Sequence, residues 1–275
     1  MTMNKCLADF LVVSDLDGTL LQVPDGISDC SRTVIRLFTM MGGRFTVASG
    51  RSPLSVKNAL KGLPLSAPAI VFNGGMLYDY QKEEPLLEHF VPRQTALSAI
   101  QFVMQQEPSV GVEILSSNGR MYLPHCCEYI CRHAAHESLP YVAAQLDDIP
   151  GDWYKILFAG SPSEIAKLEG LVQQQEWENA YFTATNQNYL ELMPAGVDKG
   201  SALQELCGRI GTAIEDVFAV GDYYNDLPML QKCGHPVAVG NAVAQVKLAS
   251  EIQVLPCRDG GVAQLLYDLI RRYGN

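Results

Sequence analysis

The sequence predicts an α/β protein, with a doubly wound parallel-sheet (Rossmann-like) core and an inserted α+β domain. Three observations indicate this. Five short apolar runs each stop at a polar residue or a glycine, most of them precede a stretch with helical periodicity, and the middle of the chain follows a different order of elements. Buried strands that alternate with helices are typical of a parallel sheet covered on both faces.

The five apolar runs are interpreted as buried parallel strands, at residues 10–13, 45–48, 69–72, 217–220 and 237–239. Helical periodicity is found at 31–41, 54–60 and 225–231. In sheets of this kind, ligands bind outside the carboxyl ends of the strands. We therefore expect the polar residues that follow the five runs to meet at one site.

The middle of the chain forms a separate module by the same criteria. Its expected helices are 95–106, 125–137 and 163–175, and its expected strands are 112–115, 121–123, 154–158 and 181–183. We predict a core of residues 1–81 and 190–275 and an inserted domain of residues 82–189. Short hinges are expected near 79–85 and 188–194, and an insertion hinged over the strand ends would act as a lid.

Composition and charge narrow the class of protein. The chain has 275 residues, 48% of them hydrophobic, which is enough to bury a full core. Lys and Arg number 20 against 30 Asp and Glu, and no basic cluster is present, so nucleic-acid binding is disfavoured. No apolar stretch approaches the roughly 20 residues that span a bilayer, and no signal peptide precedes the first strand. We expect a cytoplasmic protein with no membrane partner.

The eight cysteines are spread through expected helices and strands, which favours free buried thiols over a disulfide framework. One cluster resembles a metal site and consists of His125, Cys126, Cys127, Cys131, His133 and His136. On a single helix these side chains fall on two sides, and His125 lies about 16 Å from His136 along the axis. They cannot all hold one tetrahedral zinc ion.

The first strand is followed by Asp15-Leu16-Asp17-Gly18-Thr19-Leu20, which is the most informative segment of the chain. Asp15 and Asp17 are two positions apart, so in an extended segment they lie on the same side. Like charges at that distance repel unless a proton or a cation lies between them. A bound divalent metal is the simplest explanation.

Four motifs in order along the chain resemble those of the haloacid dehalogenase-like superfamily. They are the Asp15–Leu20 segment, Ser49-Gly50-Arg51, Val197-Asp198-Lys199-Gly200 and Gly221-Asp222-Tyr223-Tyr224-Asn225-Asp226. The long insert between the second and third motifs is similar to the cap domain of the Cof-type phosphatase branch. Phe72-Asn73-Gly74-Gly75, Ala238–Ala242 and Asp259–Ala263 also match. The resemblance covers nearly the whole chain and implies a phosphoric monoester hydrolase.

The resemblance also implies which residues act on the phosphoryl group. Asp15 is expected to be the nucleophile that forms an aspartyl-phosphate, and Asp17 the general acid and base. Lys199 is expected to neutralise Asp15 and to hold a phosphoryl oxygen. The backbone amides of Leu16 and Gly50, with the side chains of Ser49 and Asn225, complete the expected phosphate-binding set.

The cofactor that the resemblance implies is Mg²⁺, which prefers oxygen ligands. Asp15, the backbone carbonyl of Asp17, and Asp222 are its expected ligands. Asp226 is expected to support them from behind, and Arg51 to brace the carboxylates rather than to touch substrate.

Two departures from the family pattern stand out. Small or polar residues usually follow the Gly-Asp pair, whereas this chain has Tyr223 and Tyr224, whose rings either narrow the pocket or pack outward; we favour the second. Relatives often carry Asn before the acidic-Gly-Val segment, where this chain has Leu255-Pro256-Cys257-Arg258. Any substrate contact that depends on that Asn is therefore in doubt.

Three functions fit these residues. The leading one is a Mg²⁺-dependent phosphatase of small phosphorylated metabolites, such as sugar phosphates or a phosphorylated cofactor. A phosphosugar mutase would use the same aspartyl-phosphate and return the group to a sugar. A non-catalytic phosphoacceptor module would also need an acidic pocket and a lysine, but Asp17 argues against it, because a proton donor has no task where no ester is cleaved. The particular substrate and the oligomeric state stay open.

Overall fold

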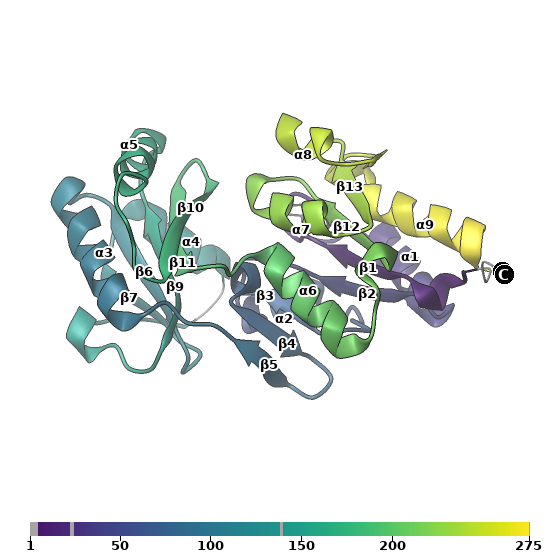
Figure 1. The fold of residues 1–275 in the computed structure, drawn as a ribbon, viewed down its shortest axis with the longest axis horizontal. Helices are drawn as coiled ribbons and strands as arrows, with labels where there is room; N and C mark the ends of the chain where they lie inside the picture. Colours follow the sequence, from purple (N-terminus) through teal and green to yellow (C-terminus); the bar gives the residue numbers. More distant parts are fainter. Residues whose placement is uncertain (1–4, 23–24, 138–139, 275) are drawn as a thin grey trace. The chain divides into compact units, whose positions relative to one another are not determined.

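The computed structural model describes residues 5–22, 25–137 and 140–274, and in it the chain divides into two units (Figure 1). Met1–Leu86 and Asp198–Asn275 form the first unit, and Leu87–Val197 form the second. The predicted limits of the insert, 82 and 189, stay a prediction. The strand β11 (Tyr189–Pro194) begins at the second limit and belongs to the sheet of the second unit.

The first unit is built on a five-stranded parallel sheet in the order β14-β13-β12-β1-β2. Its strands are β1 (Leu11–Ser14), β2 (Arg44–Val47), β12 (Val217–Gly221), β13 (His235–Val239) and β14 (Ile252–Val254). All four residues of β1 are buried. This explains why the strand has no polar alternation in the sequence, since helices cover both faces of such a sheet.

The helices of this unit are α1 (Asp29–Met40), α2 (Pro53–Leu60), α6 (Lys199–Ile210), α7 (Leu227–Lys232), α8 (Ala244–Leu248) and α9 (Gly261–Tyr273). The chain runs from β1 through α1 to β2 in one direction along the sheet, and from β12 through α7 to β13 in the other. Right-handed crossovers then put α1 and α7 on opposite faces. The helix contacts agree with two separate faces, because α1 packs beside α9 and α7 packs beside α6 (Figure 1). The connections thus diverge between β1 and β12, where such folds bind ligands.

One expectation about this sheet was wrong. The run at 69–72 is not its fifth strand, because β3 (Ala69–Val71) pairs antiparallel with β4 (Met76–Asp79), which is followed in the same sheet by β5 (Glu84–Glu88). A parallel bridge between Ala48 and Ile70 still ties β3 to the end of β2. The fifth strand is β14, which the sequence analysis did not predict. The helix expected at 225–231 is a 3₁₀ turn at Tyr224–Asp226 followed by α7.

The second unit has a six-stranded sheet in the order β10-β11-β9-β6-β7-β8. Its elements are α3 (Arg93–Gln106), β6 (Gly111–Ser116), β7 (Met121–His125), α4 (Glu128–Glu137), β8 (Tyr141–Ala143), β9 (Trp153–Ala159), α5 (Pro162–Val172), β10 (Ala180–Asn186) and β11. The hinge expected at 188–194 was wrong, because β11 is a largely buried strand between β10 and β9.

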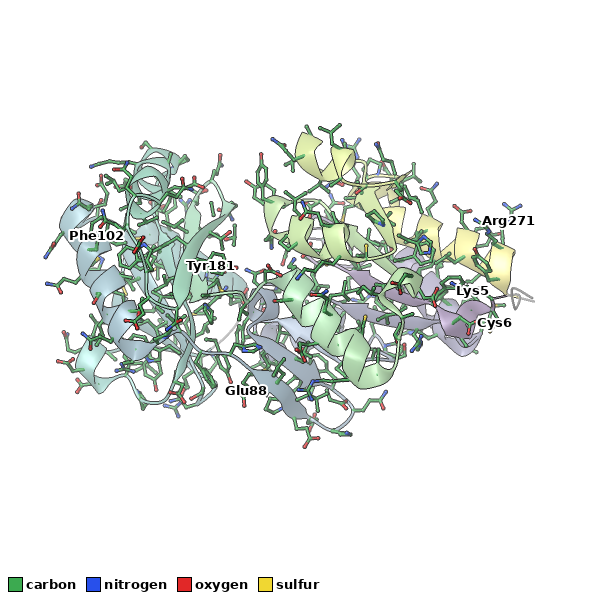
Figure 2. The ribbon with its side chains drawn as sticks, in the orientation of Figure 1. Lys5, Cys6, Glu88, Phe102, Tyr181 and Arg271 are labelled. Atoms are coloured by element: carbon green, nitrogen blue, oxygen red, sulfur yellow. The ribbon has the colours of Figure 1, made fainter. Side chains whose placement is uncertain are left out.

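Helices α3 and α5 bury the apolar side chains of β6, β9 and β11 in one core. Phe102 of α3 meets Trp177 edge-on at 5.7 Å between ring centroids (Figure 2). On β10, the Tyr181 hydroxyl donates a hydrogen bond to the Val197 carbonyl at 2.7 Å (Figure 2). The second contact ties the carboxyl end of the unit, at Val197, to its own sheet.

The other face of this sheet carries buried charges, because the residues between the core positions point away from the core. Glu113 of β6 pairs with His133 of α4 at 2.7 Å, and Lys155 of β9 pairs with Glu191 of β11 at 2.7 Å. His133 is therefore engaged within the unit, and His125 contacts the Val110 carbonyl. Among the described residues, no metal-holding group includes these histidines.

The eight cysteines are free thiols, as the sequence analysis expected, although four of them are exposed rather than buried. No helix in the described parts of the chain is both long and apolar enough to cross a membrane.

Candidate active site

Asp15 lies directly beyond β1 in the middle of the parallel sheet. Its backbone amide continues the ladder by donating to the Val220 carbonyl at 2.9 Å. Its carboxylate is buried, and Oδ1 accepts a hydrogen bond from Lys199 Nζ at 2.7 Å. Burial raises the pKa of Asp15 well above its ordinary value, and the Lys199 ammonium group opposes that rise. Burial thus favours the protonated form of Asp15, and the Lys199 ammonium group favours the ionised form.

Lys199 reaches the carboxylates from the first turn of α6. Asp198 caps that helix by accepting from the Ser201 amide at 2.7 Å. The Lys199 side chain is fully buried and donates to Asp15 and to Asp226 Oδ1, both at 2.7 Å. Burial alone lowers the pKa of Lys199, but Asp15 and Asp226 together outweigh burial and raise it, so the ammonium group stays charged.

Asp226 shapes the turn that follows β12. While Oδ1 accepts from Lys199, Oδ2 accepts from the backbone amides of Asp222 at 2.9 Å and Tyr223 at 3.1 Å. Both oxygens of this buried carboxylate are thus engaged by protein donors. This arrangement fits the expected role of Asp226 as a support for the residues in front of it.

Asp222 faces the loop that follows β1. Its Oδ1 accepts from the Thr19 hydroxyl at 2.8 Å. Gly18 has a left-handed φ of +86°, and a Cβ at that position would lie 2.6 Å from Asp222 Oδ2, so no larger residue fits there. Burial and the charge of Asp226 raise the pKa of Asp222 to about 6.

The carboxylates of Asp15, Asp222 and Asp226 converge. Each offers an oxygen within 4.8 Å of the others, which is close enough to surround one metal ion. All the donors are carboxylate oxygens, and hard divalent cations prefer such ligands. The described structure therefore has an acidic cluster, between the ends of β1 and β12, that is able to hold a cation.

Asp17 is held apart from this cluster by Arg51. The guanidinium group binds both carboxylate oxygens, from Nε to Oδ2 and from Nη2 to Oδ1, at 2.7 Å each. Nη1 of Arg51 also donates to Ser55 in α2 at 3.1 Å. Arg51 is buried while the Asp17 side chain is 40% exposed, so the arginine holds the carboxylate in a fixed plane and leaves it accessible.

The residues expected to hold phosphate come from neighbouring loops. Ser49 is buried beyond the end of β2, and its Oγ accepts from the Arg51 amide at 3.2 Å, while Leu16 is buried next to Asp15. The Asn225 side chain donates to Asn73 Oδ1 at 3.1 Å. The sequence analysis assigned no role to Asn73 or Thr19, although both belong to motifs that it singled out.

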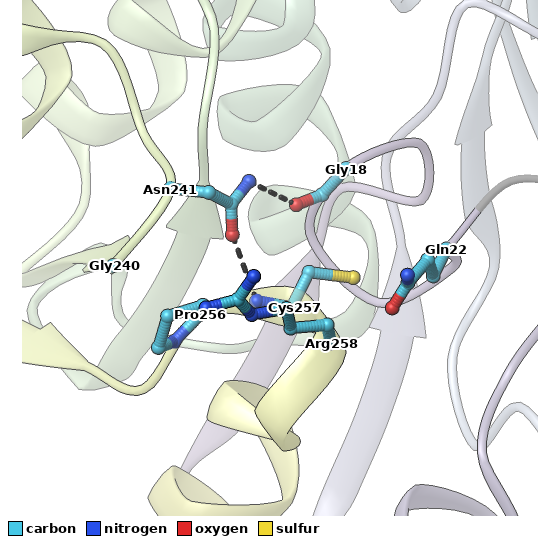
Figure 3. A pocket seen from close by; sticks show the side chains of 7 residues that line it. All are labelled: Gly18, Gln22, Gly240, Asn241, Pro256, Cys257 and Arg258. Carbon is cyan, nitrogen blue, oxygen red and sulfur yellow. Dashed lines mark hydrogen bonds between the residues drawn. The ribbon is translucent and has the colours of Figure 1, made fainter.

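A pocket of about 540 Å³ lies beside the Gly18 loop and is lined by Gly18, Gln22, Gly240, Asn241, Pro256, Cys257 and Arg258 (Figure 3). Asn241 joins its walls, because its amide donates to the Gly18 carbonyl at 2.8 Å and its Oδ1 accepts from the Cys257 amide at 2.7 Å. Burial, with the charges of Asp222 and Asp15, raises the pKa of Cys257 to about 11. The pocket thus adjoins the acidic cluster.

The two tyrosines after Asp222 pack on one another, with ring centroids 4.8 Å apart. Tyr224 is 43% exposed, and its hydroxyl lies 3.5 Å from Gln245 Oε1 on α8. The expectation that the two rings pack outward rather than narrow the pocket stays a prediction.

The family model of the haloacid dehalogenase-like hydrolases matches residues 12–266, which is nearly the whole chain. The chain belongs to the haloacid dehalogenase-like hydrolases. The family resemblance expected from the four motifs is confirmed, and with it the prediction that the protein is an enzyme.

Individual relatives agree with the family. An HMP-PP phosphatase of Enterobacter sp. (strain 638) is 26% identical over 261 residues, covering 93% of this hydrolase and 94% of the relative. A crystal structure of a haloacid dehalogenase-like hydrolase from Bacteroides thetaiotaomicron aligns with a TM-score of 0.83 at 26% identity, covering 94% of this chain and 99% of the other. The crystal structure of a protein from Thermotoga maritima aligns with a TM-score of 0.80 at 28% identity, covering 94% of this chain and 97% of the other.

Proposed function

We propose that this hydrolase is a Mg²⁺-dependent phosphatase that cleaves phosphate monoesters of small metabolites through an aspartyl-phosphate on Asp15. The observation that carries the proposal is the buried Asp15 carboxylate, held at 2.7 Å by Lys199 within a cluster of three converging acids. A nucleophile, a fixed positive charge and a cation site are what phosphoryl transfer requires from a protein.

In the first step, a carboxylate oxygen of Asp15 attacks phosphorus, and the bond from phosphorus to the ester oxygen breaks. Asp17 gives its proton to that leaving oxygen. Lys199 holds one phosphoryl oxygen, while Ser49, Asn225 and the amides of Leu16 and Gly50 hold the others. Phosphate ester hydrolysis is extremely slow without catalysis, so dividing it into two displacements, each with charge stabilisation, lowers a very high barrier.

In the second step, water attacks phosphorus and the bond between phosphorus and Asp15 breaks. Asp17, now ionised, takes the proton of the attacking water, which restores both carboxyl groups and releases inorganic phosphate. Arg51 holds both oxygens of Asp17 as hydrogen-bond acceptors, which orients the carboxylate for this second step. To give its proton in the first step, Asp17 must release one of these hydrogen bonds.

The cofactor in this proposal is Mg²⁺, held by Asp15, the Asp17 carbonyl and Asp222, with Asp226 behind them. Asp226 fits the outer position because Lys199 and two backbone amides already occupy its oxygens. When bound, the ion would neutralise negative charge on the phosphoryl oxygens.

The proposed substrates are small phosphorylated metabolites of the cytoplasm, either a sugar phosphate or a phosphorylated cofactor. The HMP-PP phosphatases among the relatives support this class, and the full-length alignment extends the similarity to the inserted unit.

The test is a screen of phosphorylated metabolites with Mg²⁺, read as release of inorganic phosphate. Asp15→Asn is expected to lower turnover by at least about 10³-fold, because the amide cannot act as the nucleophile. Asp268→Asn, the same change at an exposed position on α9, is the matched control and should keep wild-type activity. Retained turnover in Asp15→Asn refutes the proposal. Isomerised sugar phosphate without free phosphate would identify a mutase instead.

A further inference from the structure

The chain takes an unusual backbone conformation directly after β3. Phe72, Asn73 and Gly74 all have positive φ, at 51°, 54° and 104°. A bulky residue such as Phe rarely adopts the left-handed region, because its Cβ then lies too close to the backbone. Strain of this kind persists only where the surrounding structure maintains it. We call residues 72–74 the left-handed turn.

This turn holds the Ser49–Arg51 loop by its backbone. The Asn73 amide donates to the Ser49 carbonyl and the Phe72 amide to the Arg51 carbonyl, both at 3.0 Å. The Asn73 side chain also lies against Gly50, where a Cβ would be 3.0 Å from Asn73 Nδ2. The position of the Gly50 amide therefore depends on the turn.

The same turn contacts the two loops on the other side of the site. Asn73 Oδ1 accepts from the Asn225 side chain at 3.1 Å. Gly74 packs against the residue that caps α6, and a Cβ at Gly74 would lie 2.3 Å from the Asp198 carbonyl oxygen. One strained turn thus connects the Ser49 loop, the Asn225 loop and the start of the helix that carries Lys199.

We propose that Asn73 is a positioning residue for phosphate binding: it orients the Asn225 amide and the Ser49–Gly50 loop toward the phosphoryl oxygens. Asn73 does not itself touch the substrate. The inference rests on the proposed function, because the roles of Asn225, Ser49 and Gly50 belong to that proposal. Asparagine suits the position, since it tolerates left-handed φ and offers a short side-chain acceptor.

Two substitutions distinguish the role of the Asn73 side chain from that of its left-handed backbone conformation. Asn73→Gly accepts the left-handed φ and removes the acceptor, whereas Asn73→Asp retains an acceptor in the same place. Asn179→Gly is the matched control, because Asn179 has the same φ of 54° and is exposed in the second unit. Thermal unfolding of each variant separates lost stability from lost positioning.

The experiment measures binding of orthovanadate, a phosphate mimic, by inhibition of the Mg²⁺-loaded enzyme, together with kcat and KM. Asn73→Gly is expected to weaken inhibition about tenfold, since one oriented hydrogen bond to an anion is lost. Asn73→Asp should recover most of that loss. Asn225→Ala should weaken inhibition in the wild-type background but add little to Asn73→Gly, because the two residues act as one unit.

The outcomes are distinct. Additive effects of the two substitutions, or unchanged inhibition in a folded Asn73→Gly variant, would overturn the positioning role while leaving the phosphatase proposal intact. Should Asn73→Gly fail to fold, Asn73→Ser takes its place in the cycle, because serine keeps a Cβ and is too short to reach Asn225. Added Asn225→Ala should then change inhibition little, and a full additional loss argues against the link. Absence of vanadate binding to the wild-type enzyme contradicts both proposals.

Discussion

At the scale of single residues, the site depends on one buried ammonium group. Lys199 neutralises Asp15 and Asp226 at once, at 2.7 Å from each. Without that charge, two buried carboxylates would face one another in a medium of low dielectric, where like charges cannot both stay ionised at little cost. Lys199 therefore contributes to folding as well as to phosphate binding.

We predict that Lys199→Met lowers the free energy of unfolding by about 3 to 5 kcal/mol in the absence of a divalent cation, the usual cost of breaking a buried ion pair. Urea denaturation measures this. Lys167→Met is the control, because Lys167 pairs with Glu107 at the surface and should change stability by less than about 1 kcal/mol. Equal stability of the two variants would show that Lys199 has no structural role.

The role of a residue was predictable from the sequence where a recognisable motif specifies it. The resemblance of the motifs to the family predicted Asp15, Lys199 and Asp222 in one site, and Asp15 and Asp222 meet because strand ends in a parallel sheet lie at one edge. Thr19 and Asn73 were missed for a physical reason. Their partners, Asp222 and Asn225, lie 203 and 152 residues away in the chain, and no local pattern specifies such a hydrogen bond.

At the scale of elements, the hydrophobic pattern predicted strands better than it predicted their partners. The run at 69–72 resembles a central strand because β3 is fully buried, yet β3 pairs with β4. β14 is short and half exposed, so it lacks the apolar run of its neighbours. Burial determines the pattern of residues, whereas pairing depends on contacts between distant segments.

The buried charges between α4 and β6 make the second unit sensitive to pH. Burial lowers the pKa of His133, but the charge and hydrogen bond of Glu113, with the charge of Glu137, outweigh burial and raise it above the ordinary 6.5, while Lys155 opposes them. A raised pKa in the folded state stabilises that state below pH 6.5, and this contribution is lost as pH rises through the folded-state pKa.

We therefore predict that the second unit unfolds at lower urea concentration at pH 8 than at pH 6. His133→Gln should remove most of this difference, because glutamine does not titrate. His89→Gln, in the same unit, is the control. A pH dependence that is the same in His133→Gln and in wild type would exclude His133 as its source.

At the scale of the whole molecule, the net charge of −10 and the acidic cluster act in the same direction. Both favour cation binding, and a cation that binds only the folded state raises stability in proportion to the logarithm of its concentration. The cluster joins Asp15, from the first segment of this unit, to Asp222 and Asp226, from the second segment. A bound cation would therefore stabilise the whole first unit.

We predict that millimolar Mg²⁺ raises the thermal unfolding temperature relative to a chelated sample of the same ionic strength, and that chelation abolishes turnover. Asp222→Asn should reduce the stabilisation by Mg²⁺, since it removes one of the converging carboxylates. Differential scanning calorimetry measures the shift, with Na⁺ as the control for screening. An unfolding temperature that does not respond to Mg²⁺ in the wild type would argue against a divalent site.

The second unit is continuous in sequence, from Leu87 to Val197, whereas the first unit is assembled from segments on both sides of it. During synthesis, every residue of the second unit is therefore translated before β12, the strand that pairs with β1. Lys199 follows Val197 by two residues, but Asp222 and Asp226 are translated only after β12. The three carboxylates of the acidic cluster can therefore converge only after the second unit has been completely synthesised.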